Sequence, residues 1–200
     1  MIATLKDWFQ TCLSAEMMIL KDPKTMTAPS PPAHRLRTAT PEDLPFQARL
    51  YATTRHDEME AARFPTGMRE AFLGMQFDAQ TAHYMRHYPG AQWSIIDCDG
   101  ADAGRLILDR SEDHFSIIDI ALMPKYRGCG IGSALLLEVL AGAAAQHLPV
   151  QLFAFTGERA IHLYHRLGFA DLCDDGLHTE LVWRPPTSLD NATSAGNFPI

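Results

Sequence analysis

The chain has 200 residues, of which 46% are hydrophobic and 20% charged, and its formal net charge is -7. These values are typical of a globular protein of one domain, and they argue against a general nucleic-acid binder, which needs a clustered basic face. The four cysteines form no Cys-x-x-Cys pair, so we expect neither a disulfide framework nor a thiolate zinc site. No secretory leader is evident and no apolar run approaches the roughly 18 residues of a membrane span, so we expect a cytoplasmic protein.

The two ends of the chain are expected to lie outside the main domain. In the N-terminal extension, residues 1–33, apolar residues at helical spacing indicate an amphipathic helix over 2–20. The proline-rich stretch 23–32 has the composition of a linker. Residues 185–200 are rich in Pro, Ser, Asn, Thr and Gly and are expected to form a disordered tail. The domain proper is therefore predicted to span 34–184.

Within this domain the hydrophobic pattern switches between helical and strand periods. Thr40, followed by Pro41 and then by acidic residues, is typical of a helix start. In chain order we predict a strand at 34–39, helices at 44–60 and 66–88 with a turn at 64–65 between them, strands at 92–97, 103–109 and 114–122, a helix at 133–147, a strand at 150–155, a helix at 158–167 ended by Gly168, and a strand at 179–183. This order favours an α/β protein with a mixed central sheet and helices on both faces.

The stretch 119–140 combines the end of a strand, a basic glycine-rich loop and the start of a helix. The first N–H groups of a helix have no partner inside it, and the helix dipole places partial positive charge there, so phosphate suits this end. Three glycines let a bulky phosphate approach the backbone, and two basic residues add charge beside it: Gly128, Gly130, Gly132, Lys125 and Arg127. We therefore predict a pyrophosphate site.

The spacing of the glycines selects among the known phosphate loops. A P-loop needs Lys after its last glycine, and none follows Gly132. The dinucleotide fingerprint needs Gly or Ala at its third position, where Ser133 or Leu135 stands instead. The remaining pattern, residues 127–132 (Arg-Gly-Cys-Gly-Ile-Gly), resembles the Arg/Gln-x-x-Gly-x-Gly/Ala loop of the GNAT superfamily of acyl-CoA-dependent N-acyltransferases.

A second block of the sequence supports this resemblance. The family's Asn-x-x-Ala-x-x-x-Tyr-x-x-x-Gly-Phe block is matched at Ala160, Tyr164, Gly168 and Phe169. Its Asn position is Gly157, which puts one polar contact to the cofactor arm in question. The two motifs stand in the family's order, and the resemblance covers roughly residues 34–184.

The resemblance implies a GNAT-like sheet that splays apart between the strand before and the strand after the cofactor-binding helix. It also implies acetyl-CoA as cosubstrate, with its pantetheine arm paired to the backbone of the first of these strands and its pyrophosphate on the loop amides, and no metal. The implied cofactor-binding residues are Ala121, Leu122, Met123, Arg127, Gly128, Cys129, Gly130, Ile131, Gly132 and Ser133.

Two residues are candidates for the chemistry. Tyr164 falls on the family's Tyr position, whose hydroxyl points at the leaving sulfur; the simpler interpretation is a core aromatic on one helix face. Asp119 interrupts an apolar run, where burial would make it a better proton acceptor. The competing interpretation of Asp119 is a strand carboxylate paired with a basic neighbour.

We therefore expect an N-acetyltransferase that moves an acetyl group from acetyl-CoA to a primary amine of a small molecule, peptide or protein by direct attack in a ternary complex. The alternative is a catalytically silent acyl-CoA-binding or sensing module, which would share the loop. The sequence identifies neither the acceptor nor the oligomeric state, and it leaves a homodimer open.

Other polar residues have simpler explanations. His83 and His87 are four residues apart on a predicted helix, a spacing that suits a metal, but no third ligand is evident. Arg55, Glu58 and Glu60 lie between the first two helices, where the family usually binds its acceptor. Solvated helix charges are the plainer interpretation of these three.

Overall fold

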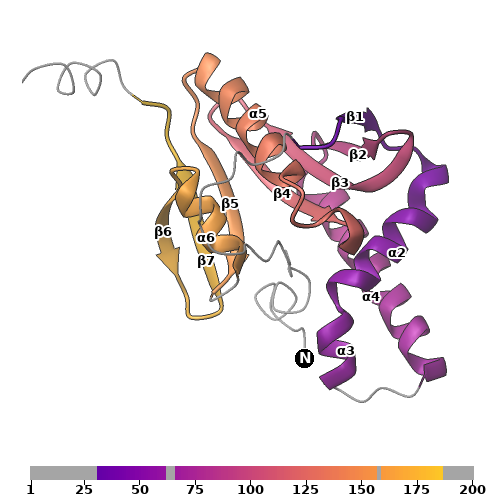
Figure 1. Cartoon of the computed structure of the whole chain (residues 1–200). Coiled ribbons are helices and arrows are strands. Elements are labelled where there is room, and N and C mark those ends of the chain that lie inside the picture. Colours follow the sequence, from indigo (N-terminus) through magenta and orange to yellow (C-terminus); the bar gives the residue numbers. More distant parts are fainter. Residues whose placement is uncertain (1–30, 62–65, 157–158, 187–200) are drawn as a thin grey trace, which may run out of the picture.

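The computed structural model describes residues 31–61, 66–156 and 159–186. A seven-stranded sheet with strand order β1-β2-β3-β4-β5-β7-β6 has helices on both faces (Figure 1). In chain order the elements are β1 (His34–Thr38), η1 (Pro41–Asp43), α2 (Leu44–Thr54), α3 (His56–Ala61), α4 (Thr66–His87), β2 (Gln92–Cys98), β3 (Ala101–Arg110), β4 (Phe115–Leu122), η2 (Pro124–Tyr126), α5 (Ile131–Ala145), β5 (Val150–Phe155), α6 (Arg159–Arg166), β6 (Ala170–Asp174) and β7 (His178–Trp183). The predicted mixed α/β class is confirmed.

One pair of strands is parallel, and its ladder is short. β4 and β5 pair only from Phe115↔Val150 to Ile117↔Leu152, although β4 continues to Leu122. All the other strand pairs are antiparallel. The sheet therefore splays between the strands that flank α5, as the resemblance implied.

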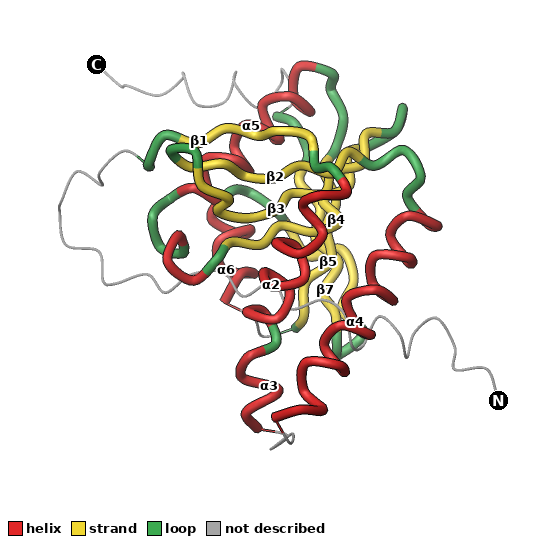
Figure 2. The backbone as a smooth tube through the Cα atoms, turned by 90° about the vertical axis from the view of Figure 1, so that its right-hand side faces the viewer, coloured by secondary structure: helices red, strands yellow, loops and turns green. Residues whose placement is uncertain are grey.

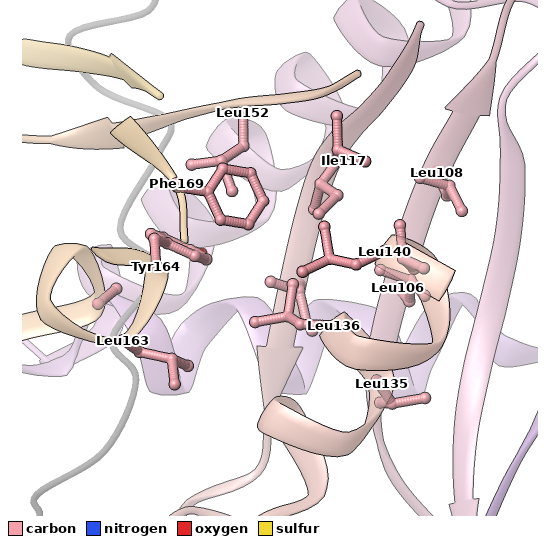
Figure 3. Packing of buried hydrophobic residues seen from close by; sticks show 14 of the residues in the cluster. Leu106, Leu108, Ile117, Leu135, Leu136, Leu140, Leu152, Leu163, Tyr164 and Phe169 are labelled. Carbon is pink, nitrogen blue, oxygen red and sulfur yellow. The ribbon is translucent and has the colours of Figure 1, made fainter. Parts of the chain in front are cut away.

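The two faces of the sheet carry different cores. On one face, α5 and α6 pack on β3, β4 and β5, with Leu136, Leu140 and Tyr164 among the buried side chains (Figure 3). On the other face, which α2 and α4 cover (Figure 2), Phe46 and Leu50 pack against Ile95 and Ala121. Because successive strand residues point to opposite faces, β4 contributes to both cores.

A β-bulge interrupts the pairing of β4 with β3. Ile107 pairs with Asp119 and Leu108 pairs with Ile117, so Ile118 is the extra residue on β4. A bulge leaves its extra residue unpaired in the ladder and bends the strand locally. The bend falls where the β4–β5 ladder stops.

The start of the first helix follows the sequence prediction. The side chain of Thr40 and that of Asp43 form a capping box, and the Thr40 N–H donates to the Asp43 carboxylate at 2.8 Å. One 3-10 turn precedes the α-helix. The predicted helix 44–60 is divided at Arg55, which ends α2 with φ -107° and ψ 7°.

Two other features differ from the sequence prediction, one strand and the start of one helix. β6 was not predicted, and all five of its residues are exposed, so its sequence has no apolar alternation to reveal it. It forms because it pairs with β7 along the edge of the sheet. The helix after the glycine loop starts at Ile131 rather than Ser133, with Gly130 as its N-terminal cap residue.

Several predictions fall on residues that the structure does not describe: the helix over 2–20, nearly all of the linker 23–32, the turn at 64–65, Gly157 and most of the tail 185–200. In the described ranges no helix is both long and apolar enough to cross a membrane.

Candidate active site

The gap between β4 and β5 contains a hollow that brings the two predicted catalytic residues together. Its walls come from β4, from β5 and from α6, which contributes Tyr164. The lining residues are Ile117, Ile118, Asp119, Ile120, Leu152, Phe153 and Tyr164. Residues 45 positions apart in the sequence therefore face one space, which opens where the parallel ladder ends.

Tyr164 is held rigidly in the wall of this hollow. Its side chain is 2% exposed, and its ring meets Phe169 edge to face at 5.7 Å between centroids (Figure 3). The C-terminal end of α6 fixes that pair, because the Phe169 N–H donates to the Tyr164 carbonyl at 3.0 Å. Gly168, with φ +91°, makes this return possible, as predicted for the residue that ends the helix.

Asp119 is nearly buried and has a cationic partner. Nε and Nη2 of Arg105 lie 2.7 and 2.6 Å from the same oxygen, Oδ2. The Arg105 side chain is 2% exposed and that of Asp119 12%. The structure thus shows the pairing with a basic neighbour that the competing interpretation described, and the role of Asp119 as a proton acceptor stays a prediction. Within the described residues, no hydrogen bond to Oδ1 is found.

Arg105 is the polar residue of this site that sequence reasoning missed. It is directed toward the α2 and α4 side of the sheet, where Nη1 lies 3.4 Å from Oε1 of Gln47 and Nη2 lies 3.4 Å from Oε1 of Gln80. Its guanidinium also lies 5.8 Å from the ring centroid of Trp93. A cation inside the apolar run of β3 was the available signal, since a buried arginine needs a partner.

The glycine loop presents backbone donors at the start of α5. Gly128 and Gly130 adopt φ values of +80° and +84°, which glycine reaches without strain. The first bond of the helix runs from the Ala134 N–H to the Gly130 carbonyl at 3.0 Å. Among the described residues, no carbonyl or side chain accepts from the amides of 128–133. These donors fit phosphate oxygens, and the helix dipole adds to the attraction.

Arg127 anchors the loop. Its Nε donates to the carbonyl of Leu122 at 2.9 Å, and its Nη2 donates to Oγ1 of Thr53 at 3.1 Å. The side chain therefore joins the loop to the end of β4 and to α2, and its charge remains beside the loop amides. Cys129 is exposed and Lys125 lies over the ring of Tyr126, 4.6 Å from its centroid.

The backbone of β4 offers alternate groups to the gap. The Met123 N–H donates to the Ala103 carbonyl of β3 at 2.8 Å, so it points away from β5. In an antiparallel pair the hydrogen-bonded positions alternate, which directs Ala121 toward β3 as well. Of the three residues predicted to pair with pantetheine, Leu122 is the one whose backbone faces away from β3, and its carbonyl already accepts from Arg127 Nε.

The remaining candidates lie elsewhere. The rings of His83 and His87 stack at 4.0 Å between centroids, and the described residues contain no group of three side chains placed to hold a metal. Arg55 is buried over the ring of Tyr51, so its interpretation as a solvated helix charge was wrong, and Glu60 pairs with Arg69. Nothing is described of the Glu58 side chain.

A splayed mixed sheet, a donor loop at the start of the intervening helix and a buried tyrosine beyond it are the features that the resemblance to acyl-CoA-dependent transferases implied. Residues 89–171 match the family model for the acetyltransferase (GNAT) domain. Over this range the chain is similar to GNAT acetyltransferase domains. The matched range runs from before β2 into β6 and leaves out α2, α3 and α4.

Individual relatives show the same similarity. The chain is 32% identical over 94 residues to a GCN5-like protein acetyltransferase of Mycobacterium tuberculosis; the match covers 42% of this chain and 46% of that protein, so it spans about half of the relative's length. The structure resembles the PaiA N-acetyltransferase of Thermoplasma acidophilum in complex with coenzyme A, with TM-score 0.58, 15% identity and coverage of 76% and 99% of the two chains.

A Corynebacterium glutamicum structure, described as histone acetyltransferase HPA2 and related acetyltransferase, gives TM-score 0.55 and 24% identity over 77% of this chain and 97% of its own. At these identities the two structures establish the fold.

Proposed function

We propose that the protein is an N-acetyltransferase that moves an acetyl group from acetyl-CoA to a primary amine by direct attack in a ternary complex. The observation that carries this proposal is the hollow at the end of the β4–β5 ladder, which Asp119 and Tyr164 both line. The glycine loop lies at the other end of the same gap, after Leu122. One elongated thioester could therefore span loop and hollow.

The residues present fit such a cosubstrate. The amides of 128–133 would hold the pyrophosphate, with the charge of Arg127 beside them, and the Leu122 N–H, which faces away from β3, would pair with the pantetheine arm. Cys129 and Ile131 contribute their backbone rather than their side chains. The ordered backbone makes this site largely preformed, so little entropy is lost on binding.

Acetyl-CoA supplies the thioester: the amine nitrogen bonds to the carbonyl carbon, the C–S bond breaks, and its electron pair leaves with the sulfur. The Tyr164 hydroxyl would donate a proton to that sulfur. Asp119, through Oδ1 or a water molecule, would take the proton that the attacking nitrogen loses. For an amine with a pKa of about 10.4, the neutral form costs about 4.6 kcal/mol at pH 7, so this acceptor matters.

The bulge in β4 supplies a further group. Ile118 is unpaired in the ladder and lines the hollow, so its backbone can interact with the thioester oxygen as that atom gains charge. None of the seven lining residues is Cys, Ser, Thr or Lys, so the hollow holds no nucleophile for an acyl-enzyme. The described lining therefore favours direct attack within a ternary complex.

Release of thiol from acetyl-CoA, measured with a panel of primary amines, tests the proposal. The expected result is amine-dependent thiol release together with a matching acetylated product identified by mass spectrometry. Calorimetry with CoA provides the second measurement. Tight binding without turnover of any amine would support a silent acyl-CoA-binding module, and failure to bind CoA would contradict both functions.

A further inference from the structure

A second hollow adjoins the first on the α4 side of the sheet. Tyr84 of α4 and Tyr88, just after that helix, form one wall, and β4 and β5 form the other. It shares four lining residues with the first hollow: Ile117, Ile118, Leu152 and Phe153. The two spaces therefore meet at the end of the β4–β5 ladder, one opening toward α6 and the other toward α4.

This second hollow is lined by aromatic and neutral side chains. Tyr84 is buried and packs against Trp93, with 6.2 Å between the ring centroids. Tyr88 is half-buried, and Phe153 is 48% exposed at the shared boundary. Its polar side chains besides the tyrosines are Ser116 and Gln151, which are uncharged. Aromatic walls favour a flat apolar group, which they contact by offset or edge-to-face packing.

The low charge of the two described linings disfavours a polycation. Asp119 is the one carboxylate among the residues that line them, and Arg105 already neutralises it at 2.6 Å. Asp109 lies near Tyr88 but outside both linings, and burial together with Asp109 raises the pKa of Tyr88, which keeps its hydroxyl neutral. The described linings offer a second or third ammonium group no further carboxylate; the nearest others are Asp109, beside Tyr88, and Glu180, which pairs with Phe153 across β5 and β7.

We infer that the acceptor is a small primary monoamine whose aliphatic arm bears one aromatic ring, with the ring against Tyr84, Tyr88 and Phe153 and the amine beside Asp119. This inference rests on the proposed acetyl transfer and names its substrate class. The nitrogen forms the new C–N bond, the thioester C–S bond breaks, and the ammonium proton leaves toward Asp119. The products are the N-acetylated arylalkylamine and the CoA thiol.

The test compares 2-phenylethylamine with hexylamine, spermidine and a lysine-containing peptide, using the full chain and acetyl-CoA. The expected kcat/KM for 2-phenylethylamine exceeds that for hexylamine about 10-fold and that for spermidine about 100-fold. Greater turnover of spermidine or of the peptide would overturn the inference and leave acetyl transfer standing.

Two substitutions and one control variant locate the effect in the second hollow. Phe153→Ala is expected to lower kcat/KM for 2-phenylethylamine about 10-fold without changing the Kd for CoA. Leu172→Ala is the matched control, because it truncates another exposed apolar side chain, 51% exposed on β6, away from both hollows. Gln151→Glu adds a carboxylate to the lining and is expected to raise the relative activity with spermidine. Equal effects of Phe153→Ala and Leu172→Ala would contradict the assignment of this wall.

A direct binding measurement separates failure of this inference from failure of the proposed function. If no amine is turned over, calorimetry of 2-phenylethylamine with the CoA-loaded protein decides the matter. Binding that Phe153→Ala weakens would support the aromatic site in a protein that is not an acetyltransferase. Absence of both turnover and binding would overturn the inference.

Discussion

Arg105 and Asp119 form an ion pair across β3 and β4 in which two nitrogens contact a single oxygen: Nε and Nη2 of Arg105 lie 2.7 and 2.6 Å from Oδ2. Within the described residues no hydrogen bond to the other oxygen, Oδ1, is found, and Asp119 lines the same hollow as Tyr164. The pair thus joins the core under α2 and α4 to the proposed reaction centre, and its removal should affect both stability and catalysis.

The first prediction concerns the stability of this pair. Arg105→Met and Asp119→Leu should each lower the free energy of unfolding by about 3–5 kcal/mol, because each leaves the other charge buried without a partner. The double variant should lose clearly less than the sum of the two, since it leaves no uncompensated charge. Urea unfolding of the four proteins measures the coupling. Strict additivity would show that the two side chains do not interact as the distances indicate.

The second prediction concerns the proton donor. Tyr164→Phe should lower kcat about 100-fold while leaving the KM for acetyl-CoA nearly unchanged, because it removes a proton donor and keeps the ring that packs on Phe169. The effect stays partial because a thiolate whose conjugate acid has a pKa of about 8.5 leaves fairly readily. Tyr126→Phe removes a hydroxyl near the loop and serves as control. Unchanged turnover of Tyr164→Phe would assign Tyr164 to packing alone.

The third prediction separates the effect of the glycine loop on CoA binding from the effect of backbone strain on stability. Gly128 and Gly176 have φ values of +80° and +84°, and a Cβ on either would meet nothing within 4 Å. Gly128→Ala and Gly176→Ala should therefore lose similar stability, about 1–2 kcal/mol. Gly128→Ala alone should raise the Kd for CoA, by about 10-fold, since it displaces the phosphate-binding amides. Equal CoA affinity in the two variants would contradict a pyrophosphate site at this loop.

The sequence predicted those features of the fold that leave a local trace. Amphipathic runs and the Thr40 cap placed most of the elements, and the position of Gly168 after α6 required only the rule for helix ends. β6 left no such trace because its five residues are all exposed and its strand conformation comes from pairing with β7. The start of α5 was misplaced by two residues because Gly130 caps that helix through its backbone, without a side-chain bond.

The residues of the candidate site also divide into those that belong to a local sequence motif and those that do not. The glycine loop and Tyr164 were predicted because each belongs to a contiguous motif. Arg105, Gln47 and Gln80 were missed because the contacts among them join β3, α2 and α4, and no local pattern encodes such a meeting. The shared hollow was predictable only from the fold, since it depends on where the β4–β5 ladder stops.

The fourth prediction concerns acid stability at the other end of the sheet. Arg37 holds the Asp43 carboxylate with bonds of 2.8 and 2.7 Å, and this contact, with the Thr40 N–H, lowers the pKa of Asp43 from its usual 3.8 to about 2. Because the folded-state pKa is the lower one, the unfolded chain binds the proton first on acidification. The contribution of Asp43 is therefore complete above about pH 4 and is lost as the pH falls toward 2.

The size of this contribution is about 1–2 kcal/mol, since Arg37 is about a third exposed and solvent weakens the pair. Asp43→Asn should thus cost about that much free energy of unfolding at pH 6, and about half as much at pH 3. Asp113→Asn, at an exposed position of the β3–β4 turn, should cost little at either pH. A cost of Asp43→Asn that stays constant from pH 6 to pH 3 would show that capping of η1, rather than the charge pair with Arg37, is what Asp43 contributes.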